Sequence, residues 1–373
     1  MRIAVNARML TQRKPGGIKN YAHETLKRIA SRHREHEFLF IVDRPFPGMA
    51  DYPAHVNFTQ AFPSFHPLLW YPWFEIALPG IMRKYNADLL FSPDGFACLS
   101  SEVSTVAVIH DLNFHHHPQD MPFLISRYYN RFFPQYAKKV KTIATVSEYS
   151  KRDIVNLYGE SPEKIVVTYC GVSESFCPLP EEEKEKVRMD ITGGAPYLLS
   201  VGALHPRKNP VRLMEAFEKF KMETGAQTKL IFVGPRLFKT EGLFRTWQRI
   251  SHKNDVLFLG MVSEEQLRRI YGAAHALMFI SYFEGFGMPA LEAMGCEVPV
   301  VSGDRTSLPE ICGDAALFVD PFSVDAIAGA MKSICFDETL RKNLIARGIL
   351  RKKFFNWDKT ADLLWEAVER SLP

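Results

Sequence analysis

The sequence predicts an α/β protein with two domains, each built on a parallel β-sheet covered by helices. Three observations support this fold class. The chain has 373 residues, and at roughly 150 residues per domain this length suggests two domains. Apolar types make up 46% of the residues and charged types 24%, which is ordinary globular composition and excludes a disordered or collagen-like chain. Short, unbroken apolar runs alternate with helical patterns, as repeated βαβ units do.

The expected strands fall into two series along the chain. Their hydrophobicity is continuous rather than alternating, which indicates strands buried on both faces of a parallel sheet. One sheet of all these strands would be large, so we expect two sheets of about six strands each. The first series is Ile3–Val5, Phe38–Val42, Asp88–Phe91, Thr105–Ile109, Thr142–Val146 and Ile165–Thr168. The second series is Tyr197–Val201, Leu230–Val233, Val256–Leu259, Ala276–Ile280, Val298–Val301 and Ala316–Val319.

The two series are separated by a segment that we interpret as the linker, Cys177–Ala195. Two prolines and a charged cluster end the first pattern, and Gly193-Gly194 precede the next strand. We therefore place an N-terminal domain at 1–178 and a C-terminal domain at 179–356. The tail, Trp357–Leu372, has a helical period with one apolar side.

Charge and cysteine content exclude several classes of protein. Lys and Arg number 46 against 42 Asp and Glu, so the net charge of +4 gives no reason to expect nucleic acid as a partner. The six cysteines form no CxxC pair, so we predict buried, reduced thiols rather than a zinc site or a disulfide framework. The N-terminus does not resemble a signal peptide, and no apolar stretch is long enough to span a membrane. We therefore expect a cytoplasmic protein.

The most informative stretch, SYFEGFGMPALE, follows an expected strand and ends at Glu292. Gly285 and Gly287 allow the backbone to approach a ligand closely. Pro289 suits the first turn of a helix, whose free amides attract phosphate oxygens. Carboxylates would repel phosphate, so we expect Glu284 and Glu292 to accept hydrogen bonds from the hydroxyls of a sugar and a ribose.

The same letters also fit the dinucleotide fingerprint G-x-G-x-x-A, at Gly285–Ala290, with Asp304 near the offset of a ribose-binding acid. That fingerprint normally lies in the first βα turn of its domain, whereas here it follows about the fourth strand of the second series. The first βα turn of that series, Val201–Asn209, has no such glycine pattern. An NAD-dependent oxidoreductase is kept as an alternative on this pattern alone.

The two acids around GFGMPAL, with Pro206–Asn209 upstream, resemble the retaining glycosyltransferases of the GT4 family. The resemblance covers most of the chain and implies the GT-B fold, in which two Rossmann-like doubly wound parallel-sheet domains face an interdomain cleft. The acceptor would bind mainly to the first domain and the nucleotide-sugar donor mainly to the second. The family's last helix commonly returns to the first domain, so residues 357–373 are expected to pack there. The further motifs are Pro15-Gly16-Gly17, Val108–Asp111, Thr145–Glu148, Gly171-Val172, Val201-Gly202, Leu308–Glu310 and Gly313–Ala316.

The resemblance also implies roles for particular residues. In the donor site, cations, backbone amides and a glycine loop would hold the diphosphate, with Arg suited to a bidentate grip and Lys to a point charge. Some relatives have an additional basic residue where this chain has Ala203, so its two cations carry more of the phosphate charge. The diphosphate group consists of Arg207, Lys208, Gly16, Gly17, Gly287 and Met288.

Three further residues would contact the sugars. The resemblance implies that Glu284 contacts the donor sugar, that His110 hydrogen-bonds it beside the reacting carbon, and that Glu292 binds the ribose hydroxyls. Each residue also has a structural interpretation. The two glutamates are alternatively surface acids, the Arg207-Lys208 pair a solvated pair of charges, and His110 a satisfied histidine at a strand end.

The expected function is transfer of a mannose- or glucose-type hexose from a nucleotide diphosphate sugar to a glycan or lipid-linked acceptor, in surface polysaccharide biosynthesis. GDP-mannose is the first expected donor and UDP-glucose the second. Departure of the nucleoside diphosphate develops negative charge, which cations and helix-start amides stabilise. We therefore expect no cofactor and no obligatory metal. The resemblance implies a same-face displacement assisted by the leaving phosphate, which needs no carboxylate nucleophile. The alternatives are a sugar-nucleotide epimerase of GT-B-like fold and a noncatalytic sugar-nucleotide-binding protein.

Three other segments each have more than one interpretation. The run His115–His117 suggests a metal site, but adjacent residues do not converge on one ion, so an acceptor-side loop is favoured. The stretch Arg8–Arg34 has eight basic residues and one acid. It predicts either a helix resting on anionic lipid at the inner face of the membrane or a solvated face over a buried apolar stripe. For the aromatic segment Phe62–Phe74 there are three interpretations: insertion into a membrane interface, stacking on sugar rings, or packing into the core.

Overall fold

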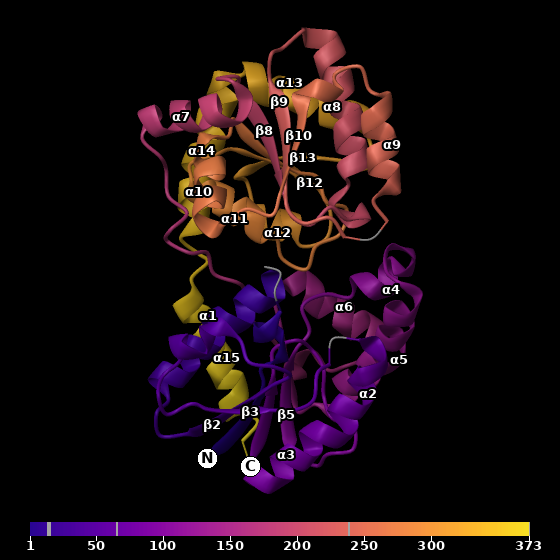
Figure 1. The fold of residues 1–373 in the computed structure, drawn as a ribbon, viewed down its shortest axis with the longest axis vertical. Helices are drawn as coiled ribbons and strands as arrows, with labels where there is room; N and C mark the ends of the chain where they lie inside the picture. The colour runs from indigo at the N-terminus through magenta and orange to yellow at the C-terminus, as the bar shows by residue number, and fades with distance from the viewer. Residues whose placement is uncertain (13–15, 65, 238, 373) are drawn as a thin grey trace. The chain divides into compact units, whose positions relative to one another are not determined.

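The structure, a computed structural model, describes residues 1–12, 16–64, 66–237 and 239–372. The chain divides into two compact units, Met1–Gly171 with Asn356–Pro373, and Val172–Phe355 (Figure 1). Each unit contains one parallel sheet flanked by helices, so the predicted fold class is confirmed. Five residues of the predicted segments, Arg13, Lys14, Pro15, Phe65 and Pro373, lie outside the described residues.

The first unit contains a seven-stranded sheet in the order β3-β2-β1-β4-β5-β6-β7. Six of these strands fall on the predicted apolar runs. The other, β3, is a short strand at the edge of the sheet with partly exposed polar residues, so it has no apolar run that predicts it. The strands are β1 (Arg2–Asn6), β2 (Glu37–Val42), β3 (Asn57–Gln60), β4 (Leu89–Ser92), β5 (Ser104–Val108), β6 (Thr142–Thr145) and β7 (Ile165–Val167).

The helices of the first unit include one from the far end of the chain. Helix α15 lies beside α1 (Figure 1), with Trp365 stacked on His33 at 3.8 Å between ring centroids. Its apolar side, which includes Leu364 and Val368, is buried as its period predicts. The helices are α1 (Gly17–Arg32), α2 (Trp70–Pro72), α3 (Leu78–Tyr85), α4 (Asn113–His116), α5 (Phe123–Lys139), α6 (Glu148–Tyr158) and α15 (Trp357–Glu369).

The second unit contains a six-stranded sheet in the order β10-β9-β8-β11-β12-β13. The strand order reverses between β8 and β11, as it does between β1 and β4 in the first unit. At such a point the loops after the two strands diverge to opposite faces of the sheet, and open α/β sheets bind their ligands there. The strands are β8 (Tyr197–Val201), β9 (Lys229–Val233), β10 (Val256–Gly260), β11 (Ala276–Phe279), β12 (Val300–Gly303) and β13 (Ala316–Val319).

The segment predicted as a linker contains a helix of the second unit, α7. Three glutamates in its first turn stabilise the positive end of the helix dipole, and Gly193, at φ 68°, terminates it. The division between the units falls earlier, at Gly171 and Val172. The helices are α7 (Glu181–Thr192), α8 (Pro210–Thr224), α9 (Glu241–Arg249), α10 (Glu264–Ala273), α11 (Met288–Gly295), α12 (Leu308–Cys312), α13 (Val324–Phe336) and α14 (Glu338–Lys352).

Most of the basic N-terminal segment forms helix α1. The apolar stripe of α1, which includes Tyr21, Leu26 and Ile29, is buried in the first unit and is not available to lipid. In the aromatic segment, Trp73 and Phe74 are likewise buried. No helix in the described part of the chain has the length and apolarity needed to cross a membrane. Peripheral contact with a membrane stays a prediction.

Candidate active site

The predicted donor-binding residues of the second unit lie on two loops where the strand order reverses, and on the helix α11 that follows one of them. One loop leads from β8 to α8 and carries Arg207 and Lys208, and the other leads from β11 to α11 and carries Glu284. Because β8 and β11 are neighbours in the sheet, these loops meet although they are far apart in the sequence. The backbone N–H of Tyr282 donates to the carbonyl oxygen of Arg207 at 3.0 Å, which joins them directly.

Glu284 is the centre of a charge cluster in this site. Its Oε2 accepts from Arg207 Nη1 at 2.7 Å and its Oε1 from Lys208 Nζ at 2.5 Å. The Glu284 side chain is only 7% exposed, so it is not a surface acid. Although burial favours protonation, the two adjacent cations lower the pKa of Glu284 from 4.5 to about 2. Glu284 is therefore ionised at neutral pH and acts only as a hydrogen-bond acceptor.

The loop that carries Glu284 is held by residues that follow β12. Ser307 donates its hydroxyl to the carbonyl oxygens of Glu284 and Phe286, at 2.9 and 2.7 Å. Thr306 accepts from the backbone N–H of Glu284 at 3.1 Å. Sequence reasoning missed both residues. Their signal was their position, because they follow a predicted strand and therefore lie at the same edge of the sheet.

Two glycines with positive φ allow the backbone of these loops to lie close to neighbouring side chains. Gly202 has φ 137°, and a Cβ there would lie 3.2 Å from Cε of Lys208. Gly287 has φ 127°, and a Cβ there would lie 3.0 Å from a methyl group of Leu308. Gly287 directly precedes α11, which begins at Met288, and no side chain caps this helix start. Backbone amides thus stand at a helix N-terminus in the loop of Glu284, as an anion site requires.

Glu292 lies in α11, one turn beyond this helix start, and its carboxylate accepts a hydrogen bond from the Tyr271 hydroxyl at 2.8 Å. Burial raises the pKa of Glu292 from 4.5 to about 7, and the Tyr271 hydrogen bond and the charge of Lys208 only partly oppose this effect. Glu292 is therefore not a solvated surface acid. Sequence reasoning missed Tyr271, because its position in α10 gives it the pattern of an ordinary core residue.

His110 lies in the first unit, directly after β5. Its Nε2 is 2.8 Å from the carbonyl oxygen of Pro93, which can only accept, so Nε2 carries the proton. Tyr21 contacts the ring edge-on at 5.0 Å between centroids. Burial lowers the pKa of His110 below 6.5, partly offset by the Pro93 bond and by nearby Asp111 and Asp94. The neutral ring therefore offers Nδ1 as an acceptor.

Gly16 and Gly17 also belong to the first unit. Gly17 begins α1, Gly16 precedes it, and both are exposed. Their backbone is thus at a helix start, one turn before the Tyr21 that contacts His110. Two of the three predicted residues of the first unit thus lie at the start of α1, and the third, His110, contacts Tyr21 of the same helix. The other six predicted residues belong to the second unit.

Two of the three consecutive histidines contact side chains of neighbouring helices. His116 pairs through Nε2 with the Asp153 carboxylate at 2.8 Å, and His115 contacts Asn130. No group of three or more potential metal ligands occurs within residues 1–12, 16–64, 66–237 and 239–372. Four of the six cysteines are buried, as predicted, and none of the six forms a disulfide within the described residues.

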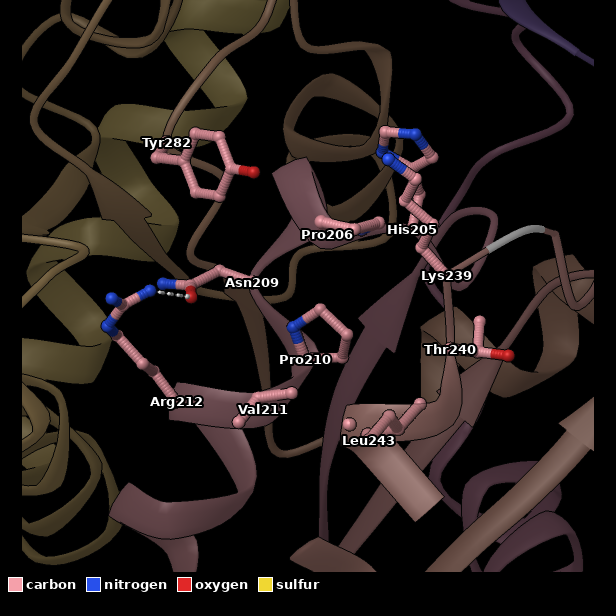
Figure 2. A pocket seen from close by; sticks show the side chains of 11 residues that line it. His205, Pro206, Asn209, Pro210, Val211, Arg212, Lys239, Thr240, Leu243 and Tyr282 are labelled. Carbon is pink, nitrogen blue, oxygen red and sulfur yellow. Dashed lines mark hydrogen bonds between the residues drawn. The ribbon is translucent and has the colours of Figure 1, made fainter. Parts of the chain in front are cut away.

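A small cavity of about 160 Å³ opens beside the loop of Arg207 (Figure 2). Pro206 and Pro210 form part of its wall, Tyr282 and Thr240 add hydroxyl groups, and His205 and Lys239 also line it. The glutamates at 284 and 292 do not line it. This cavity is therefore additional space at the carboxyl end of the sheet of the second unit, and the sequence alone did not predict it.

Comparison with known proteins supports a single family. Residues 181–351 match the family described as glycosyl transferases group 1, and residues 15–176 match the one described as glycosyltransferase family 4. The chain is 34% identical over 281 residues to O-antigen chain mannosyltransferase B of Escherichia coli, covering 74% of this chain and 73% of that protein. It is 30% identical over 284 residues to O-antigen chain mannosyltransferase RfbU of Salmonella typhimurium, covering 76% and 75% of the two chains.

A solved structure agrees with the fold. Sucrose-phosphate synthase from Thermosynechococcus elongatus superposes with a TM-score of 0.79 at 18% identity, over 99% of this chain and 98% of that one. Two Rossmann-like units with six- and seven-stranded parallel sheets are the units of the GT-B fold. The motifs, the sheet topology and the relatives agree, and the chain belongs to the group 1 glycosyltransferases of family 4, the GT4 enzymes.

Proposed function

We propose that this glycosyltransferase moves a mannose- or glucose-type hexose from a nucleotide diphosphate sugar to a glycan or lipid-linked acceptor, with retention of anomeric configuration. Surface polysaccharide biosynthesis is the proposed process, and GDP-mannose the first proposed donor. The names of the two O-antigen mannosyltransferases support this choice of sugar and process. UDP-glucose is the second proposed donor.

The charge cluster of the second unit is the observation that carries this proposal. Arg207 and Lys208 both form ion pairs with the ionised Glu284, whose loop leads to the helix start at Met288. A diphosphate needs such cations and amides, most of all as it departs and gains negative charge. Glu284 is only an acceptor, which suits it to orient the hydroxyl groups of the donor sugar.

The residues of the first unit have complementary proposed roles. The neutral His110 ring accepts a hydrogen bond from a sugar hydroxyl through Nδ1, and the backbone at Gly16 and Gly17 approaches the donor phosphates. No carboxylate attacks the sugar in this proposal. The acceptor hydroxyl attacks from the face that the leaving diphosphate occupies, and a phosphate oxygen takes its proton. The bond to the diphosphate breaks as the new glycosidic bond forms.

The test is incubation of the protein with GDP-mannose or UDP-glucose, with and without acceptor glycans. Transfer predicts that nucleoside diphosphate is released only with acceptor, and proton NMR of the new linkage reports the same anomeric configuration as the donor. Conversion of the donor sugar without acceptor would instead identify an epimerase. Donor binding without turnover on any acceptor would favour the noncatalytic alternative.

We also propose that transfer needs no divalent metal ion, because Arg207 and Lys208 supply the positive charge at the diphosphate. Activity should therefore persist, within about twofold, after dialysis against EDTA. The assay is nucleotide release with and without added Mg²⁺ or Mn²⁺. Complete loss of activity in EDTA, restored by either ion, would contradict this proposal.

A further inference from the structure

A second polar network surrounds the loop whose Pro93 carbonyl contacts His110. The loop follows β4 and contains Ser92, Pro93 and Asp94, and β4 pairs with β1, where the strand order of the first sheet reverses. Asn6 and Arg8, at the end of β1 and just beyond it, reach across to this loop. All of these polar side chains are at least nine-tenths buried, with Asp94 6% exposed and Arg8 8% exposed.

The contacts hold the loop on both sides of Pro93. The amide nitrogen of Asn6 donates to the Ser92 hydroxyl at 2.9 Å and to Oδ1 of Asp94 at 2.7 Å. Arg8 donates to Oδ2 of Asp94 through Nε at 3.2 Å and through Nη2 at 2.9 Å. Residues 92 and 94 are thus both fixed by β1 and the turn after it.

Aromatic rings pack against Arg8, the cation that holds Asp94. The guanidinium of Arg8 lies 4.4 Å from the centroid of the Phe96 ring and 5.1 Å from that of Phe74. Its fork-shaped pair of bonds to Asp94 and these flat contacts leave it a single orientation. Burial of the Arg8–Asp94 ion pair costs desolvation free energy, which the mutual attraction of the two charges offsets only when their geometry is good.

The carbonyl of Pro93, between the two clamped residues, is the group to which Nε2 of His110 donates. A neutral imidazole carries its proton on either nitrogen, and the partner of one nitrogen decides the role of the other. A fixed Pro93 carbonyl therefore selects the tautomer that leaves Nδ1 as an acceptor. A mobile carbonyl would allow the ring to rotate or to exchange tautomers.

We propose that Asp94, held by Asn6 and Arg8, is a positioning residue for His110, because it fixes the Pro93 carbonyl and thereby the tautomer and orientation of the ring. This inference rests on the proposed role of His110 in transfer. It extends that role to three residues that no sequence motif of the family resemblance included.

Two variants release the loop with little other change. Asn6→Leu is close in size, and since the side-chain oxygen of Asn6 has no hydrogen-bond partner within the described residues, only its two donated bonds are lost. Arg8→Lys keeps the charge and loses the fork. The matched control is Thr142→Val, which removes a buried 2.7 Å hydrogen bond to Ser371 at the amino end of β6 in the same sheet.

The first readout is nitrogen-15 NMR of the His110 ring, assigned by loss of its signals in His110→Gln. In the wild type we expect protonated Nε2 and unprotonated Nδ1. In Asn6→Leu and Arg8→Lys we expect averaged signals of mixed tautomers, and in Thr142→Val the wild-type signals. Wild-type ring signals in both loop variants would overturn the inference. If either variant does not fold, Ser92→Ala is the milder test, with a smaller shift in the same direction.

The second readout is kinetic. Both loop variants should lower kcat by about 10- to 100-fold, because small misplacements of a reacting group are costly, while the donor KM changes by less than about twofold. Unchanged kcat in both would also overturn the inference. The proposed function fails separately if His110→Gln itself keeps wild-type kcat, because that result removes His110 from the reaction whatever the tautomer.

Discussion

Replacing Glu292 with glutamine is expected to raise the stability of the ligand-free protein at pH 8 and to weaken its binding of nucleotides. Burial raises the pKa of Glu292 to about 7 from an ordinary value of 4.5. A carboxyl whose pKa is higher in the folded state stabilises the fold below pH 4.5, and that advantage is lost as the pH rises to 7. The difference corresponds to at most about 3 kcal/mol, all of it absent above pH 7.

Thermal unfolding at several pH values measures this effect. The melting temperature of Glu292→Gln should equal that of the wild type near pH 4.5, exceed it increasingly up to about pH 7, and stay above it by a constant margin to pH 8. The glutamine keeps an oxygen that accepts from Tyr271, so the hydrogen bond is retained. Equal melting temperatures at pH 8 would show that Glu292 is ionised without cost, contrary to its buried position.

The same residue predicts a pH dependence of ligand binding. In the ribose-binding role that the family resemblance implies, the ribose hydroxyls would donate to the ionised form of Glu292. Nucleotide affinity of the wild type should then rise between pH 6 and 8, whereas that of Glu292→Gln should stay flat and weaker. Isothermal titration with GDP or UDP measures both curves. Parallel curves for the two proteins would remove Glu292 from the ribose site.

Replacing Lys208 with methionine is expected to weaken binding of the nucleotide diphosphate sugar by about 10- to 100-fold, the range of a lost hydrogen bond to a charged group. Nζ of Lys208 lies 2.5 Å from Oε1 of Glu284, and the Lys208 side chain is only 15% exposed. Solvent therefore screens its charge only weakly. Methionine keeps much of its length and its contact with the Phe279 ring. Titration of the donor measures the change.

The matched control for Lys208 is Lys219→Met. Lys219 also forms an ion pair in the second unit, with Asp325, but it lies on the solvent-exposed side of α8 with 41% of its side chain exposed. Its replacement should leave donor affinity within about twofold of the wild type. Equal effects of the two substitutions would mean that Lys208 contributes only to the overall charge of the unit.

The fold was predictable because buried parallel strands have continuous apolar runs. The run Ala316–Val319 coincides with β13, whereas Val298–Val301 is displaced from β12, which begins at Val300. Hydrophobicity marks burial and not hydrogen bonding, so residues before a strand extend its run. The edge strand β3 and the helix α7 were missed because neither has an apolar pattern. Each depends on contacts with neighbouring elements that the local sequence does not reveal.

The site was predictable to the extent that its residues lie in the two loops after neighbouring strands. The pairing of Glu284 with Arg207 and Lys208 was not predicted, because sequence reasoning assigned these three charges to sugar and phosphate and not to one another. The Tyr271 partner of Glu292 and the Asp94 clamp of Pro93 were also missed. Both depend on contacts between residues that belong to different elements and have no motif of their own.

The most direct test of the account is thermal unfolding of the wild type and Lys208→Met with GDP, GDP-mannose, UDP, UDP-glucose and NAD. A ligand at 100 times its dissociation constant stabilises the native protein by about 2.7 kcal/mol, a readily measured shift. We predict stabilisation by one nucleoside diphosphate and its sugar conjugate, reduced in Lys208→Met. Stabilisation by NAD alone, equal in both proteins, would contradict a nucleotide-sugar site at this charge cluster.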